Sequence, residues 1–367
     1  MAFTKESLNT SISIVVGTRP EIIKMAPIVK ICEELDLPHE IIHTGQHYSY
    51  ELDSLIVGEL NLPAPDYNLN IGSGSHAEET ARALVGLETI FRTTQPSIVL
   101  VQGDTNSTLA GALAATKMHI PVGHVEAGLR SFDRQMPEET NRILTDHISD
   151  HLFAPTERSS KNLLAEGIDA HKITITGNTI VDVINLGLES GARGRTYPDD
   201  DFLLLTLHRE ENVDVEQKLR NILRGVDGIA RKYDLRVRFP AHPRTSKRLK
   251  EYDISVPDRF VVTPPVGYIE FLRLEQSARM ILTDSGGVQE EACVLGTPCV
   301  TLRTNTERPE TIEVGANYLA GLQPDKMVLG ADKMMKSSRS WINPFGDGRA
   351  SGRIVKAITR MNGKMIE

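Results

Sequence analysis

Three carboxylates follow predicted strands closely in the sequence, and carboxylates in such positions can take up and return protons. Asp104 comes after a strand-length apolar run, Glu126 comes directly after the next run, and Glu138 follows twelve residues later. Taken singly, each has a structural explanation: Asp104 could cap a helix, Glu126 could pair with Arg130, and Glu138 could be a first-turn acid after Pro137. Together at successive strand ends, they predict acid/base chemistry on an uncharged part of a substrate.

Histidine and arginine recur after two later strands. His208 and Arg209 directly follow the apolar run 202–207, and His242 and Arg244 stand after the next strand. A lone histidine is more often structural than catalytic, but the repeated pairing predicts a surface suited to phosphate.

The segment 281–291 leads from an apolar strand through a small polar turn into a helix. Free backbone N–H groups at Ser285, Gly286 and Gly287, together with the helix dipole, would favour a phosphate there. The glycines permit close backbone approach, and the serine can add a hydroxyl. A serine-capped helix with a tight glycine turn explains the same residues, and the turn alone does not separate these alternatives.

A second set of cations stands near the start of the chain, after the strand 12–16. Pro20 suits a first helical turn, and Thr18 with Glu21 has the spacing of a capping box. That structural explanation leaves Arg19 and Lys24 unexplained, because two cations at a helix start oppose its dipole. We therefore expect this pair to serve an anion.

The elements that position these residues alternate between apolar strands and helical patterns, which predicts parallel sheets covered by helices on both faces. Strands are expected at 12–16, 40–43, 97–101, 122–126, 151–154, 173–176, 202–207, 236–239, 259–262, 280–283 and 299–302, and helices include 22–35, 109–117, 159–166, 215–232 and 288–295. The polar stretch 190–201 interrupts the alternation. We expect two Rossmann-like α/β domains, 1–189 with the carboxylates and 190–367 with the phosphate turn, facing across a cleft where the ligand binds; the last helix could pack back on the first domain.

Composition narrows the class of protein. The chain has 367 residues and a formal net charge of -8, which argues against nonspecific nucleic-acid or membrane binding. No apolar run approaches bilayer length, and residues 1–10 lack the apolar core of a signal peptide, so we expect a cytoplasmic protein. Cys32, Cys293 and Cys299 lie in apolar runs and are expected to be reduced core residues.

Several familiar sites have no signature here. There is no GxxxxGK[ST] motif, no GxGxxG after a strand and no GxSxG elbow. The acidic and histidine residues lack tight ligand spacing, so we predict no metal.

The motifs GTRPE at 17–21, GDT at 103–105, HVEAGLR at 124–130, PEE at 137–139, HRE at 208–210 and DSGGVQEE at 284–291 strongly resemble the non-hydrolysing UDP-N-acetylglucosamine 2-epimerases. The resemblance covers nearly the whole chain, and the segment 343–348 is similar to that family's closing segment. It implies a two-domain glycosyltransferase-B fold and a homodimer.

The resemblance also implies a reaction. UDP is eliminated from C1 while C2 loses its proton, giving 2-acetamidoglucal, and UDP re-adds with protonation on the opposite face of C2. No cofactor is required, and the product feeds cell-surface polysaccharide synthesis. The route needs a held pyrophosphate and acid/base groups reaching C2.

Position by position, the resemblance implies three groups of site residues. Asp104, Glu126, Glu138 and His208 are implied to be catalytic; Arg19, Phe271, Ser285, Gly286, Gly287 and Glu291 to bind UDP; and Lys24, Gln46, His47, His242 and Arg244 to form a second, regulatory substrate site. Alternatives are a 2-epimerase of another UDP-sugar such as UDP-2,3-diacetamido-2,3-dideoxy-glucuronate, a hydrolysing epimerase, an inverting glycosyltransferase of the same fold, and a non-catalytic UDP-sugar sensor.

Overall fold

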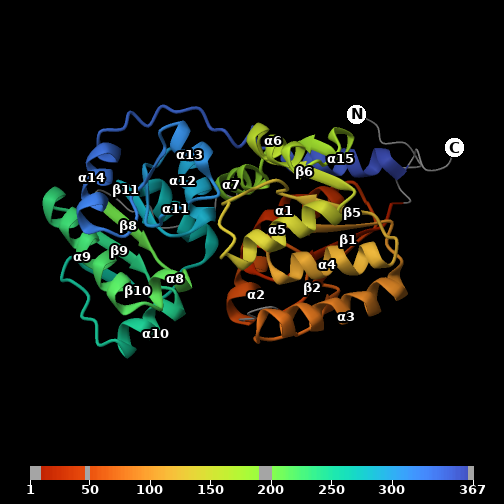
Figure 1. Cartoon of the computed structure of the whole chain (residues 1–367), viewed down its shortest axis with the longest axis horizontal. Helices are drawn as coiled ribbons and strands as arrows, with labels where there is room; N and C mark the ends of the chain where they lie inside the picture. The colour runs from red at the N-terminus through yellow and green to blue at the C-terminus, as the bar shows by residue number, and fades with distance from the viewer. Residues whose placement is uncertain (1–9, 46–49, 190–200, 363–367) are drawn as a thin grey trace. The chain divides into compact units, whose positions relative to one another are not determined.

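The computed structural model describes residues 10–45, 50–189 and 201–362, which form two α/β units (Figure 1). One unit comprises Met1–Glu189 with Phe345–Glu367, and the other comprises Ser190–Pro344. The last helix belongs to the first unit, where it packs on the first and seventh helices. The sequence placed it in the domain 190–367, as a helix that could pack back on the first domain.

The first unit is built on a seven-stranded sheet in the order β3-β2-β1-β4-β5-β6-β7, and every pairing is parallel. Its strands are β1 Ile12–Val16, β2 His39–His43, β3 Tyr67–Asn68, β4 Ile98–Gln102, β5 Val122–Val125, β6 His151–Ala154 and β7 Ile173–Ile175. Its helices are α1 Arg19–Glu34, α2 Tyr50–Glu59, α3 His76–Thr94, α4 Asn106–Lys117, α5 Pro137–Ile148, α6 Glu157–Ala165, the 3-10 turn η2 Ala170–Lys172, α7 Thr179–Glu189 and α15 Ala350–Asn362.

The second unit is built on a six-stranded parallel sheet in the order β10-β9-β8-β11-β12-β13. Its strands are β8 Phe202–Thr206, β9 Arg236–Pro240, β10 Phe260–Thr263, β11 Met280–Thr283, β12 Cys299–Thr301 and β13 Asn317–Leu319. Its helices are α8 Glu210–Val213, α9 Glu216–Tyr233, α10 Pro243–Glu251, α11 Tyr268–Ser277, α12 Gly286–Leu295, α13 Pro309–Glu313 and α14 Pro324–Met335.

The central strands of the sheets, such as β4 and β8, are buried on both faces. Along β8, Leu203 and Leu205 belong to one core cluster, whereas Phe202 and Leu204 belong to another. Alternate residues of a strand point to opposite faces, so a strand between two helical layers must be apolar throughout. This is why the continuous apolar runs of the sequence became strands, and each strand predicted from them is present. The prediction of two parallel-sheet α/β domains is confirmed.

Both sheets have the strand order of a Rossmann fold. The early strands are added on one side of the first strand of the unit, and the later strands are added on its other side. Ligands of such sheets bind beyond the carboxyl ends of the strands at this switch point. It lies between β1 and β4 in the first unit, and between β8 and β11 in the second. Of the residues singled out from the sequence, Arg19, Asp104, His208 and Ser285 to Gly287 directly follow these four strands.

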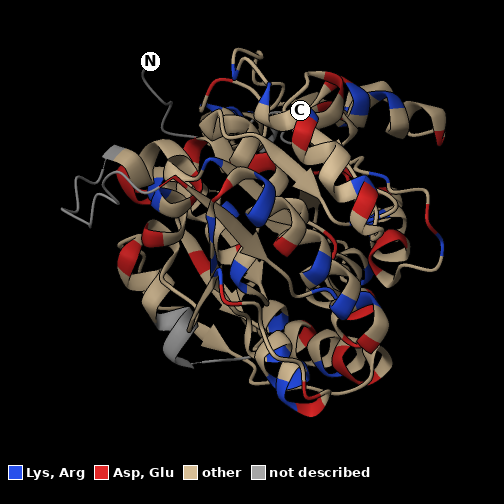
Figure 2. Ribbon diagram, turned by 90° about the vertical axis from the view of Figure 1, so that its left-hand side faces the viewer, with Lys and Arg blue, Asp and Glu red and all other residues tan. Residues whose placement is uncertain are grey.

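Two further predictions can be compared with the structure. All three cysteines are free and buried. None of the helices in the described ranges is long and apolar enough to cross a bilayer. Figure 2 shows basic and acidic residues interspersed along the helices, in keeping with the small net charge.

Candidate active site

Glu126 is a strained, buried carboxylate directly after β5. Its backbone has φ +72°, in the left-handed region that non-glycine residues seldom occupy, and only 7% of its surface is exposed. Such strain costs about 1–3 kcal/mol and concentrates at functional sites. The neighbouring N–H groups of Glu126 and Ala127 both donate to the carbonyl of Phe153, which fixes the backbone.

Polar side chains from three elements surround the Glu126 carboxylate. Lys24 Nζ on α1 lies 2.6 Å from Oε1 and is itself 5% exposed. Asn178 donates to the same oxygen at 3.4 Å, and the amide of Gln102, at the end of β4, donates to Oε2. A cation and two amide donors stabilise the ionised carboxylate and fix its direction.

This geometry changes two interpretations made from the sequence. The alternative that Glu126 pairs with Arg130 is wrong, because Arg130 binds Asp146 at 2.8 Å and Glu166 at 2.6 Å. Lys24 was expected to serve a bound anion, and its partner in the chain is instead the Glu126 carboxylate. The ion pair explains a cation near the start of α1 without a ligand.

Asp104 lies in the turn between β4 and α4 and is held by two residues of α5. Its carboxylate binds Arg142 of α5, and its carbonyl accepts from Asn141 at 2.9 Å. The alternative that Asp104 caps α4 is wrong, since the N-cap is Thr105, whose hydroxyl accepts from Thr108 N. About a third of the Asp104 side chain, 31%, remains exposed and open to a substrate.

Glu21 ties the turn after β1 to the start of α4, directly after Asp104. The Glu21 carboxylate accepts from Thr18 N at 2.6 Å, which is one half of the predicted capping box, and from the hydroxyls of Thr105 and Thr108. Burial raises the pKa of Glu21, and the hydrogen bonds from Thr18, Thr105, Thr108 and Gly17 oppose that shift. Arg19 is the first residue of α1.

Glu138 is half-buried in the first turn of α5, next to a carboxylate that sequence analysis did not single out. Glu139 is only 1% exposed and accepts from the backbone N–H groups of Ser131 and Phe132, both at 2.9 Å. Arg142 bridges Glu139 and Asp104, so the loop before α5 and the β4 turn share one cation.

In the second unit, His208 is oriented by a buried aspartate. Asp284 accepts from the backbone N–H groups of His208 and Arg209 at 3.1 Å each and from Asn212 at 3.2 Å. His208 Nδ1 lies 3.2 Å from Asp284 Oδ1, and 40% of the histidine side chain is exposed. Burial alone would raise the pKa of Asp284, but His208, Asn212 and the Arg209 N–H hold it below its ordinary value.

The pairing of Nδ1 with Asp284 leaves Nε2 of His208 directed away from that carboxylate, which is the arrangement of an oriented proton donor. Asp284 was absent from the predicted site, although it opens the DSGGVQEE motif.

The two arginines expected to form a phosphate surface have acidic partners in the chain. Arg244 binds Asp214 through Nε at 3.0 Å and NH2 at 2.6 Å, and also binds Glu210. Arg209 lies 3.6 Å from Glu307. His242 is the N-cap of α10 and accepts from Arg244 N, with its ring 6.0 Å from that of His208.

Gln46 and His47, expected at the same second site, lie outside the described residues.

The predicted anion turn caps α12. Ser285 is the N-cap, and its hydroxyl accepts from Val288 N at 3.4 Å. A Cβ on Gly286 would lie 2.4 Å from Glu307 Oε1, so the glycine there makes room for a carboxylate of the chain itself. A Cβ on Gly287 would meet nothing closer than 3.9 Å, so this second glycine leaves the turn open to a ligand.

Glu291 on α12 lies in a buried acidic group with Glu275 and Tyr268 of α11. Glu275 is fully buried, and burial followed by the charge of Glu291 raises its pKa well above the ordinary value. A protonated Glu275 can donate to Glu291, whereas two carboxylates would repel each other. Phe271 of α11 packs against the core cluster that includes Val288 and Ala292 of α12.

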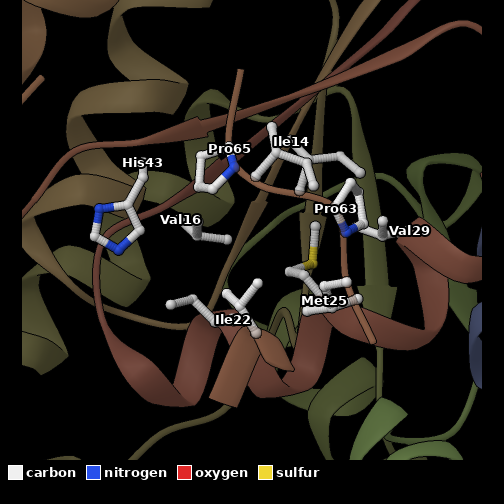
Figure 3. Close-up of a pocket in the computed structure, with 11 residues that line it drawn as sticks. Ile14, Val16, Ile22, Met25, Val29, His43, Pro63 and Pro65 are labelled. Atoms are coloured by element: carbon white, nitrogen blue, oxygen red, sulfur yellow. The ribbon is translucent and has the colours of Figure 1, made fainter. Parts of the chain in front are cut away.

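One apolar pocket of the first unit lies apart from these residues. Figure 3 shows Ile14, Val16, Ile22, Met25 and His43 around it, and none of the predicted site residues lines it. Burial lowers the pKa of His43 to about 4, so this histidine is neutral. No group of three metal-binding side chains occurs within the described residues.

Comparisons with known proteins identify relatives of this chain. Residues 30–359 match the family model described as UDP-N-acetylglucosamine 2-epimerase. The UDP-N-acetylglucosamine 2-epimerase of Methanocaldococcus jannaschii is 52% identical over 95% of this chain and 98% of its own. Its crystal structure in complex with UDP-GlcNAc and UDP has a TM-score of 0.92, covering 96% of this chain and 100% of that one.

A relative with a different named substrate is also similar. The UDP-2,3-diacetamido-2,3-dideoxy-D-glucuronate 2-epimerase of Pseudomonas aeruginosa is 41% identical over 95% of this chain and 99% of its own.

Proposed function

This chain belongs to the UDP-N-acetylglucosamine 2-epimerase family, and on that premise we propose that it interconverts UDP-GlcNAc and UDP-ManNAc reversibly at C2. The observation that carries the proposal is the Glu126 carboxylate, which is buried, strained and held by Lys24 at 2.6 Å. Asp104 and Glu138 stand in the neighbouring turn and helix and supply further acid/base groups.

The chemistry requires elimination and not simple proton exchange, because C1 of a nucleotide sugar is an acetal and does not acidify the C2 proton. The C2 proton passes to a carboxylate, and the electrons of the C2–H bond form the C1–C2 double bond. The C1–O bond breaks, and the electron pair of that bond leaves with UDP. This yields 2-acetamidoglucal. UDP then adds back to C1, and a proton is delivered to the opposite face of C2, so atoms and charge balance with no cofactor.

We assign the carboxylates Asp104, Glu126 and Glu138 to the proton transfers. Two chemical environments support a division of labour between them: Glu126 is buried against a lysine, whereas Asp104 is partly exposed against an arginine. Groups with different environments can hold protons of different acidity, which a reaction needing both a base and an acid requires.

We assign the leaving UDP to Arg19, Phe271, Ser285, Gly286, Gly287 and Glu291, with His208 at the diphosphate. An imidazole N–H oriented by Asp284 can stabilise the charge that develops on the departing phosphate oxygen. The N-terminus of α12 adds backbone N–H groups and a favourable dipole.

A second, regulatory UDP-sugar bound by Lys24, Gln46, His47, His242 and Arg244 also remains a proposal. The proximity of the His242 and His208 rings, 6.0 Å apart, supports communication between such a site and the diphosphate. Sigmoidal dependence of rate on UDP-GlcNAc, lost in His242→Ala, tests it.

The strongest alternative is the same chemistry on a UDP-diacetamido-glucuronate, supported by the similarity to the Pseudomonas aeruginosa enzyme. A panel of UDP-sugars followed by proton NMR separates the two. Conversion of UDP-GlcNAc with no change in total nucleotide sugar supports the proposal, and conversion only of the glucuronate favours the alternative. Accumulation of free UDP identifies a hydrolysing epimerase, and transfer to an added acceptor identifies an inverting glycosyltransferase.

Three properties of the family complete the proposal. We expect a homodimer, a cytoplasmic location, and a product that supplies cell-surface polysaccharide synthesis. Light scattering of the purified full chain, fractionation of cells, and the polysaccharide composition of a deletion strain test these in turn.

A further inference from the structure

His124, two residues before Glu126, is a fully buried histidine of β5 whose two ring nitrogens both face acceptors. Nδ1 lies 2.7 Å from Asp146 Oδ1, and Nε2 lies 2.8 Å from the carbonyl oxygen of Gly103. A carbonyl can only accept, and so can an ionised carboxylate. A neutral imidazole carries a single N–H. In one of the two contacts, the lone pair of the unprotonated ring nitrogen would then face a lone pair of the oxygen.

The Asp146 side of this contact is a carboxylate with its own cation. Asp146 Oδ2 lies 2.8 Å from Arg130 NH2 and accepts from Gly128 N at 3.2 Å. Burial alone would raise the pKa of Asp146, but His124 and Arg130 together lower it below the ordinary value. Arg130 and the Gly128 N–H stabilise the negative charge of Asp146 whatever the state of His124, and an ionised carboxylate cannot donate to the histidine.

The Gly103 side of this contact belongs to the Asp104 turn. Gly103 has φ +77° and donates its N–H to the carbonyl of Val125 at 3.1 Å. Its carbonyl points to His124, so both polar groups of this residue bind β5. The turn that presents Asp104 is thereby joined to the strand that ends at Glu126.

We propose that His124 acts as a positioning residue in its doubly protonated form, donating to Asp146 and Gly103 at once and so fixing Asp104 relative to Glu126. The inference rests on the proposed catalytic roles of those two carboxylates. His124 itself is buried and touches no substrate.

The charges around the ring are balanced when it is protonated. Asp146 of α5 contacts the ring directly. Arg130, in the loop after β5, binds Asp146, and Glu166 at the end of α6 binds Arg130. His147 Nε2 lies 3.7 Å from Glu166 and is 44% exposed, so its charge is screened by water. Two cations, His124 and Arg130, then face two carboxylates, Asp146 and Glu166.

A ring that carried a single N–H would lose the contact with Gly103, because Asp146 keeps the stronger, charge-assisted hydrogen bond. Asp104 would shift relative to Glu126, which lowers kcat. KM for the UDP-sugar would change little, since the residues assigned to UDP other than Arg19 belong to the second unit.

The first test reads the ring without any turnover. The full chain is labelled with ¹⁵N-histidine, and the ring nitrogens of His124 are assigned by their loss in His124→Gln. We expect both nitrogens to carry protons at pH 7. A neutral His124 ring at that pH overturns the inference, whereas a wild-type chain that fails to epimerise any UDP-sugar refutes the proposed function instead.

The second test compares two variants that both remove the charge. In His124→Gln an amide can still donate to Gly103, and in His124→Leu nothing can. We expect kcat to fall about 100-fold in the leucine variant, as for a misplaced catalytic group, with substantial recovery in the glutamine variant and little change of KM in either. Equal kcat in both variants, with folding checked by circular dichroism, contradicts the positioning role.

Discussion

Lys24 and Glu126, 102 positions apart in the sequence, form a buried ion pair with Nζ 2.6 Å from Oε1. The lysine lies in the second turn of α1, and the glutamate directly follows β5 with a left-handed backbone. A buried pair of this kind is strongly destabilising when one partner is removed, because the other charge stays in a medium that cannot solvate it.

Replacing Lys24 by Met is expected to lower the free energy of unfolding by about 3–5 kcal/mol and to abolish turnover. The double variant Lys24→Met/Glu126→Gln removes the orphaned charge, so it should regain much of the stability but none of the activity. Lys30→Met, a half-buried lysine on the same helix, serves as control and should stay within about 0.5 kcal/mol of the wild type. Urea denaturation measures all three, and a Lys24→Met chain as stable as the control contradicts the ion pair.

Neutral amides at the three carboxylates test the proposed proton transfers. Asp104→Asn, Glu126→Gln and Glu138→Gln keep the side-chain shape and should each lower kcat about 10²- to 10⁴-fold. Glu157→Gln is the matched control, since Glu157 is also a first-turn carboxylate, on α6, but is exposed. Initial rates by NMR give the comparison; turnover at the control's level in all three variants would refute the assigned roles.

The adjacent glycines of the α12 turn should respond differently to alanine. Gly286→Ala places Cβ 2.4 Å from Glu307 Oε1 and should destabilise the fold by about 1–3 kcal/mol through overpacking. Gly287→Ala has space and should keep or slightly raise stability, since alanine favours a helix. It should nevertheless weaken UDP binding, because the new methyl group stands where a phosphate approaches. Calorimetric titration with UDP measures this, and unchanged affinity in Gly287→Ala argues against the anion turn.

Glu275 gives the stability a predictable pH dependence. Burial, with the charge of Glu291 beside it, raises its pKa well above the ordinary value, so the folded chain retains a proton that the unfolded chain releases above about pH 4.3. The stabilisation is complete below that pH and is lost as pH rises toward the folded pKa.

Glu275→Gln carries a donor that does not titrate, so its free energy of unfolding should exceed that of the wild type at pH 8, with the gap closing toward pH 4. Glu270→Gln on the same helix should keep the wild-type pH profile. Denaturation at several pH values checks both, and parallel curves for Glu275→Gln and wild type would show that Glu275 is ionised.

The sequence predicted the strands and the carboxylates at their ends because both follow from local patterns. A strand buried on two faces must be a continuous apolar run, as β8 is, and the carboxyl ends of parallel strands meet at one edge of a sheet. The sequence alone therefore predicts that Asp104 and Glu126 lie at the same edge of the sheet. The family motifs made the fold assignment specific.

Pairings between distant residues could not be predicted in this way. Nothing in the local sequence joins Lys24 to Glu126, and the nearer Arg130 seemed the natural partner of that glutamate. Arg130 instead serves Asp146 and Glu166, on α5 and just after α6. The buried carboxylates Asp284 and Glu139, which hold backbone next to site residues, were not predicted either. A carboxylate that accepts backbone N–H groups has no distinctive spacing in the sequence. The position of Asp284 at the head of a phosphate turn was the one available signal.

The central claim is that C2 exchanges its proton with the protein while UDP is detached. Conversion of UDP-GlcNAc by the full chain in deuterated buffer, followed by proton NMR, tests it most directly. The account predicts UDP-ManNAc carrying deuterium at C2, with no net release of UDP. UDP-ManNAc that retains its original C2 proton, or the absence of any ManNAc nucleotide, would contradict it.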